Sequence, residues 1–176
     1  MEERAAQAIQ QLIRRRGEIA GRKVLQKLCY FVQEAEGTPL GLGFRMLHYG
    51  PYSDQLDETL WDLAATGNVT LEESPDSTLI VRPGALQELT EAPKEMSEAV
   101  DRVLTGLGQD GGLTLELLAT CHFLARLTGY DGTPTARDEV VRRVEAWKGS
   151  KFQPYFIVQQ LSKLERLGYL PTATVA

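Results

Sequence analysis

Apolar residues recur at helical spacing along most of the chain, and this pattern predicts a mainly helical fold. The clearest stripe predicts a helix over residues 22–35 and consists of Val24, Leu25, Leu28, Phe31, Val32 and Ala35. Similar stripes predict further helices over residues 2–16, 53–66, 96–107, 113–128, 135–147 and 154–167. In the 135–147 helix the stripe includes Trp147, and Thr135 is expected to cap the start.

Three short β-prone segments interrupt this pattern. Residues 44–48 are expected as a strand, and the following Gly50-Pro51 pair is expected to turn the chain into a helix that Ser53 caps. Residues 68–73 and 78–82 flank a Ser-Pro-Asp-Ser sequence that favours a turn, so they are expected to pair as a hairpin.

The order helix, helix, strand, helix, hairpin predicts a winged helix-turn-helix-like unit over residues 1–83. A helical connector is expected over 84–112, followed by a C-terminal helical unit over 113–176 that packs on the first. The third and last helices both end in Leu-x-x-Leu, three further residues and a glycine, so we interpret the second unit as winged-helix-like without a hairpin. The alternative is that this ending is simply a common way for helices to stop.

The composition indicates the type of protein and the compartment in which it is expected. The net charge is −5, with 43% hydrophobic and 24% charged residues, which is typical of a globular protein and gives no overall attraction for nucleic acid. No apolar run reaches the roughly 18 residues that a membrane helix needs, and the charged N-terminus lacks a signal-peptide core, so a cytoplasmic location is expected. A disulfide between the two cysteines is not expected there.

The side chains that usually perform catalysis or hold metals are sparse. Cys29, His48, Cys121 and His122 are too scattered to predict a metal site. Both cysteines lie within apolar patterns, which raises the pKa of a thiol and does not activate it as a nucleophile. No phosphate loop or dinucleotide fingerprint is present. These observations predict no catalytic residues, no cofactor and no enzymatic function.

The most unusual local sequence is the YGPYS corner, which we define as His48, Tyr49, Gly50, Pro51, Tyr52 and Ser53. One interpretation is a recognition corner that binds a partner, because it leads into a helix N-terminus that can receive an anion or a carbonyl. The other interpretation is a structural turn with two packed tyrosines, whose hydroxyls need hydrogen-bond partners if they are buried.

Nucleic-acid binding is the usual role of a winged helix, but the predicted third helix carries four acidic residues and no Lys or Arg. Such a helix is repelled by phosphates. Basic residues cluster elsewhere and are candidates for contacting nucleic acid or an acidic partner: Arg14, Arg15, Arg16, Arg22, Lys23, Arg142 and Arg143. For most of them a solvated helix face is the alternative.

Two motifs carry a family resemblance. Residues 24–33, VLQKLCYFVQ, resemble the Lys-Leu-Gln-Lys-Leu-Leu-Tyr-Phe-Ala-Gln segment of Panacea-domain (SocA-like) antitoxins, and His48-Tyr49-Gly50-Pro51 followed by Leu56 resembles their Tyr-Gly-Pro element. The chain is similar over more of its length to the uncharacterised bacterial YwgA-type proteins, which share the YGPYS corner and a late Gly-Tyr-Leu. It departs from the antitoxin pattern at Val24 and Tyr52, which favours the YwgA-type branch. The resemblance implies a small helical module that binds a protein partner and has no known catalysis.

Three functional hypotheses follow. The first is a non-catalytic regulatory module that acts through protein–protein contacts, with an antitoxin-like role included. The second is a nucleic-acid-binding transcriptional regulator that uses the basic helix faces, and the third is an enzyme of unrecognised type. The acidic third helix favours the first hypothesis over the second. A protein partner and no membrane partner are expected, and the sequence leaves homo-oligomerisation open.

Overall fold

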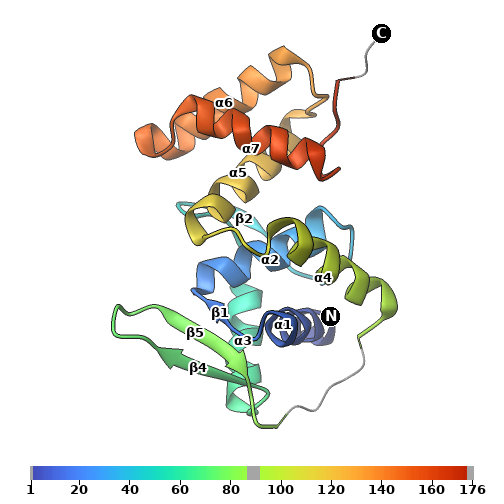
Figure 1. Ribbon diagram of the computed structural model, residues 1–176, viewed down its shortest axis with the longest axis vertical. Helices are drawn as coiled ribbons and strands as arrows, with labels where there is room; N and C mark the ends of the chain where they lie inside the picture. Colours follow the sequence, from blue (N-terminus) through green and yellow to red (C-terminus); the bar gives the residue numbers. More distant parts are fainter. Residues whose placement is uncertain (1, 87–91, 174–176) are drawn as a thin grey trace. The chain divides into compact units, whose positions relative to one another are not determined.

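A computed structural model describes residues 2–86 and 92–173 (Figure 1). Within these residues the fold is mainly helical, with seven α-helices and two small sheets, so the predicted class is confirmed. The elements are α1 (Glu2–Arg16), β1 (Ile19–Ala20), α2 (Arg22–Glu34), β2 (Arg45–Leu47), β3 (Gly50–Tyr52), α3 (Asp54–Ala65), β4 (Val69–Glu73), β5 (Leu79–Pro83), α4 (Lys94–Leu107), α5 (Gly112–Thr128), α6 (Pro134–Lys148), the 3-10 helix η1 (Gly149–Lys151) and α7 (Pro154–Arg166). No helix of the described residues is long and apolar enough to cross a membrane.

The chain divides into two compact units that are not contiguous in sequence. Unit 1 consists of Met1–Arg45 and Tyr52–Leu115, and unit 2 consists of Met46–Pro51 and Glu116–Ala176. The division therefore passes through α5 and takes the first part of the YGPYS corner into unit 2. The predicted three-part division at residues 83 and 112 stays a prediction.

The core of unit 1 is built by four helices. α1 contacts α2, α3 and α4, and α4 also contacts α2. Their apolar stripes are buried as the spacing predicts: Ile9 and Leu12 of α1, Leu25 of α2 and Val100 of α4 are all 0% exposed. Burial of each such side chain stabilises the fold by about 1.5–3 kcal/mol.

A three-stranded antiparallel sheet completes unit 1, in the order β1–β5–β4. The β4–β5 hairpin lies where the sequence predicts it, with Leu71 opposite Val81 (Figure 1). The third strand, β1, pairs Ile19 with Val81. β1 was not predicted, because two residues are too few to show a period-2 pattern.

In unit 2, α6 and α7 lie side by side and are joined by η1 (Figure 1). Their inward positions, including Val140, Val144, Ile157 and Leu161, are fully buried. Two predicted details are wrong. The N-cap of α6 is Thr133, whose hydroxyl accepts from the Ala136 N–H at 3.3 Å, because the chain enters the helix at Pro134. Trp147 is 50% exposed, because the buried positions of α6 are Val140, Val144 and Lys148, and Trp147 lies to one side of that line.

Candidate functional site

The YGPYS corner consists of the turn between β2 and β3, strand β3 itself and the N-cap residue of α3. β2 and β3 form a two-stranded sheet, and His48 and Tyr49 occupy the turn between them. The predicted turn at Gly50-Pro51 is therefore wrong, because these residues belong to β3. Gly50 has a φ of 85°, a conformation that side chains with a Cβ rarely adopt, so a glycine suits this position.

The end of the corner is fixed in unit 1 by a buried glutamine. The Gln26 Oε1 accepts from the Ser53 N–H at 3.0 Å, and its Nε2 donates to the Ser53 carbonyl at 2.8 Å and to Asp57 Oδ1 at 2.9 Å. Gln26 is 1% exposed and Ser53 is 0% exposed. Ser53 also caps α3 as predicted, because its Oγ accepts from the Leu56 N–H at 3.4 Å.

Asp57 extends this network to the surface. Its Oδ2 accepts from the Tyr52 hydroxyl at 2.5 Å and lies 3.2 Å from the Arg22 guanidinium. Burial, followed by the hydrogen bond to Asp57, raises the pKa of Tyr52 to about 12. One of the two corner tyrosines and one of the predicted basic residues therefore belong to a structural network that fixes the start of α3.

The beginning of the corner is fixed in unit 2 by a buried ion pair. Lys148 Nζ donates to the His48 carbonyl and to Glu116 Oε1, the latter at 2.9 Å. Lys151 Nζ donates to the same carboxylate oxygen at 2.6 Å. The side chains of Glu116 and Lys148 are 0% and 1% exposed, so two opposite charges are held away from water next to the corner.

The outer surface of the corner is aromatic. Tyr49 is 57% exposed, its ring lies 4.8 Å from the His48 imidazole between centroids, and Lys151 Nζ lies 5.1 Å from its centroid. A lysine at this distance from a ring makes a cation–π contact. Of the predicted recognition residues, His48 and Tyr49 are thus exposed, whereas Gly50, Pro51 and Ser53 are buried and Tyr52 is half-buried.

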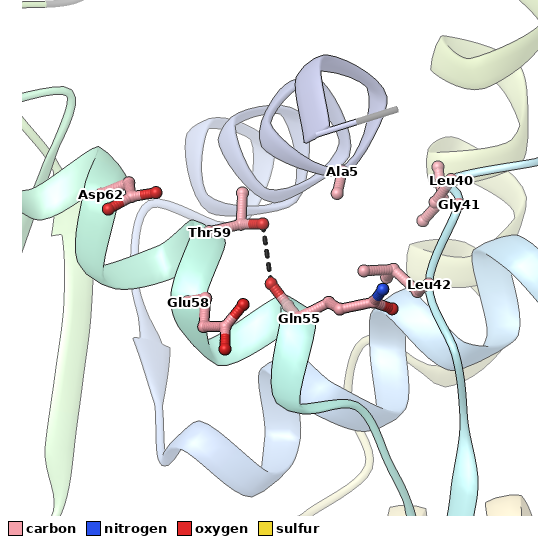
Figure 2. Close-up of a pocket in the computed structure, with 8 residues that line it drawn as sticks. All are labelled: Ala5, Leu40, Gly41, Leu42, Gln55, Glu58, Thr59 and Asp62. Atoms are coloured by element: carbon pink, nitrogen blue, oxygen red, sulfur yellow. Dashed lines mark hydrogen bonds between the residues drawn. The ribbon is translucent and has the colours of Figure 1, made fainter.

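A pocket of about 230 Å³ opens on unit 1 (Figure 2). Figure 2 shows its walls, formed by Gln55, Glu58, Thr59 and Asp62 of α3, Ala5 of α1 and the loop residues Leu40, Gly41 and Leu42. The loop is pinned to α2 by Gln33, which accepts from the Leu42 N–H at 2.9 Å and donates to its carbonyl at 2.8 Å. Gln55 Oε1 accepts from the Gly43 N–H at 2.8 Å and so links the loop to α3.

The chemistry of the pocket comes from two carboxylates. Glu58 and Asp62 are four residues apart on α3, so they lie on one helix face with Gln55 and Thr59 beside them. Carboxylates can accept a proton from water or hold sugar hydroxyls. In the sequence these acidic residues only argued against groove binding, whereas their Gln-x-x-Glu-Thr-x-x-Asp spacing along one face was the signal for a pocket.

The predicted basic residues lie in two separate groups. Arg14, Arg15 and Arg16 end α1, where Arg15 pairs with Asp101 at 2.7 Å, and Arg22 and Lys23 begin α2. All of these belong to unit 1. Arg142 and Arg143 belong to α6 of unit 2 and both pair with Glu139, at 2.6 and 2.7 Å.

The two thiols are inert. Cys29 and Cys121 are free and buried, and burial raises the pKa of each well above its usual range. Among residues 2–86 and 92–173, no group of three or more His, Cys, Asp or Glu side chains is arranged to hold a metal ion.

Sequence reasoning missed the residues that anchor the corner. Gln26 and Glu116 fall within apolar helical stretches, and Lys148 lies one turn after the buried Val144, so a polar residue at a buried helical position was the available signal. Gln26 lies between the apolar positions Leu25 and Leu28, and Glu116 lies between Leu115 and Leu117. Their hydrogen-bond partners lie 27 or more residues away in the sequence, so the pairing could not be predicted from local spacing.

Comparison with known proteins adds the functional context. No protein-family model matches the chain. Over 146 aligned residues, which cover 77% of the chain, it is 36% identical to a protein from Thermus aquaticus named DNA ADP-ribosyl glycohydrolase. The chain spans 38% of the length of that relative.

This similarity corrects the sequence-based hypothesis. The predictions of a non-catalytic protein-binding module with an antitoxin-like role, and of no enzymatic function, are wrong because the relative is named as an enzyme. The resemblance to YwgA-type and Panacea-domain proteins stays a prediction. Over 77% of its length, the chain is thus similar to a protein that is named as a glycohydrolase.

Proposed function

We propose that this protein acts in the hydrolytic removal of ADP-ribose from DNA. The observation that carries the proposal is the 36% identity to a DNA ADP-ribosyl glycohydrolase over 77% of the chain. Because the chain spans 38% of that relative, the activity of the longer protein is a proposal for this one.

The reaction requires few groups. Water adds to the anomeric carbon of the ribose, the bond from that carbon to the DNA breaks, and the leaving atom on the DNA takes up a proton. A carboxylate that accepts the proton of the attacking water is the usual catalyst for glycosidic bonds.

The pocket on unit 1 is the candidate reaction site. Its volume of about 230 Å³ is below the roughly 300–1,000 Å³ of pockets that enclose a drug-sized ligand, so it suits one sugar ring better than a whole ADP-ribose. The negative charges of Glu58 and Asp62 repel the diphosphate, so the ribose next to the DNA is the part that fits. Since both carboxylates lie on one helix face, they provide a base on one side of the sugar.

The direct test is release of ADP-ribose from a single-stranded oligonucleotide that carries the modification, followed by chromatography. We expect release by the wild-type chain and a reduction of about 100-fold or more in Glu58→Gln or Asp62→Asn, whichever residue is the base. Glu73→Gln is the matched control, because it removes the same charge from the exposed end of β4. No release by the wild type overturns the proposal, and equal rates in all three variants overturn the choice of pocket.

We also infer the winged helix-turn-helix-like arrangement that the sequence predicts for residues 1–83. It is supported by the order α1, α2, α3, β4, β5 and by the addition of β1 to the hairpin. A related three-helix arrangement of α5, α6 and α7 is supported by the shared helix ending, since Gly67 and Gly168 both have a φ of 75°. In both endings the N–H after the glycine donates back to the leucine of the last turn, at 2.9 Å.

A further inference from the structure

The two units of the chain differ in the sign of their charge. Residues 116–176 contain eight Lys or Arg and six Asp or Glu, whereas the rest of the sequence contains eleven and eighteen. A polyanion is therefore attracted to the C-terminal part of an acidic protein and repelled by the remainder.

Three of the four exposed aromatic side chains among residues 2–86 and 92–173 lie in unit 2, which contains residues 116–176. Trp147 at the end of α6 is 50% exposed, Tyr155 at the start of α7 is 75% exposed, and Tyr49 of the corner is 57% exposed. All three belong to unit 2. Aromatic side chains usually stabilise a fold by being buried. Rings that stay exposed are therefore candidates for contact with a ligand.

Basic side chains accompany these rings. Arg143 and Trp147 are four residues apart on α6 and so share one helix face. Lys151 follows in η1, with its Nζ 5.1 Å from the centroid of Tyr49. Glu139 pairs with both Arg142 and Arg143, and Glu116 pairs with both Lys148 and Lys151. Each cluster therefore keeps one net positive charge, which attracts a phosphate.

We propose that unit 2 binds single-stranded DNA through its exposed aromatic and basic side chains, namely Tyr49, Arg143, Trp147, Lys151 and Tyr155. Exposed aromatic rings stack on unpaired bases of any sequence, and neighbouring cations follow the phosphate backbone. Duplex DNA fits less well, because its bases are already stacked and its grooves are read mainly by hydrogen-bonding side chains. The inference supplies the DNA contact that the proposed function requires, but it rests on a different surface from the pocket.

The chain offers a matched pair of tryptophans for the test. Trp61 is 52% exposed, almost the same as Trp147, but it lies on the acidic helix α3 of unit 1. The experiment is fluorescence anisotropy of a labelled, unmodified 15-nucleotide oligo-dT, titrated with wild-type chain, Trp147→Ala and Trp61→Ala at 50 and 200 mM salt. Circular dichroism of each variant checks that the fold is retained.

We expect binding by the wild type that weakens with salt, a loss of affinity of about tenfold in Trp147→Ala, and unchanged affinity in Trp61→Ala. Trp147 fluorescence in a Trp61→Phe background is expected to be quenched when the oligonucleotide is added. No binding at 50 mM salt, equal loss in the two tryptophan variants, or tighter binding to the matching duplex overturns the proposal. Because the DNA carries no ADP-ribose, this result is independent of whether the chain is a glycohydrolase.

Discussion

The two ends of the YGPYS corner are anchored by buried side chains of different kinds. In unit 1 the neutral amide of Gln26 bonds both the N–H and the carbonyl of Ser53. In unit 2 the ammonium of Lys148 bonds the carbonyl of His48 and is neutralised by Glu116. The neutral amide of Gln26 pairs a backbone donor and a backbone acceptor without burying a charge. The charged Lys148 can be buried only because a further residue, Glu116, neutralises it. The ionic anchor is therefore the more vulnerable one.

The largest effect is expected from Glu116→Gln. Removing the carboxylate leaves the Lys148 ammonium buried without an opposite charge, which costs about 3–5 kcal/mol in the free energy of unfolding. The measurement is guanidinium unfolding in a Trp61→Phe background, so that Trp147 reports on unit 2.

The control for this variant is the double substitution Glu116→Leu/Lys148→Met. It removes both buried charges and is expected to recover most of the lost stability, because apolar side chains can replace a buried ion pair without loss. A single variant that loses less than about 1 kcal/mol would show that Lys148 is not held by Glu116.

An intermediate effect is expected from Gln26→Leu. The Ser53 N–H and carbonyl lose their side-chain partner in a buried place. Both are neutral groups, so we expect each to cost an amount at the lower end of about 1–3 kcal/mol. Gln160→Leu is the matched control, since Gln160 is also buried, at 4% exposure, but its Oε1 makes no hydrogen bond. If both substitutions change the free energy of unfolding equally, the anchoring role of Gln26 is contradicted.

The smallest effect concerns alkaline pH. Burial, and then hydrogen bonds to Asp57 and Glu165, raise the pKa of Tyr52 and Tyr130 to about 12. The unfolded chain releases these protons near pH 10, before the folded chain does, so the free energy of unfolding falls as pH rises from 10 to 12. Tyr52→Phe in unit 1 and Tyr130→Phe in unit 2 are each expected to flatten this fall.

Urea unfolding at pH 8 to 11.5 measures the slope for both variants. Tyr155→Phe is the control, since it makes the same chemical change at a ring that is 75% exposed and lies outside both hydrogen-bond networks. A steeper fall in Tyr52→Phe than in wild type would show that the phenol does not release its proton later in the folded state.

The helices were predictable because each carries a long apolar stripe that one face must bury. The stripes of α2 and α4 repeat over three or more turns, so local spacing alone determined them. The two-residue β1 and the turn at His48 and Tyr49 were not predictable, because both depend on backbone pairing with another strand.

The candidate site was less predictable from the sequence than the fold was. The YGPYS corner was recognised as unusual, but its anchors Gln26 and Lys148 are brought to it by tertiary structure. Trp147 was assigned to a buried stripe because spacing alone does not tell the centre of an apolar face from its edge. The pocket required the loop after α2 to fold against α3, which no local pattern encodes.

The division into two non-contiguous units determines how the chain can be truncated. Residues 46–51 belong to unit 2, although the 64 residues from Tyr52 to Leu115 separate them from the rest of that unit. A fragment that starts near Glu116 would therefore lack the His48 carbonyl that Lys148 bonds, and a fragment that ends there would carry a segment without its support. Neither fragment contains all the residues of one unit and nothing else, so we expect the two units to fold only when they are expressed as one chain.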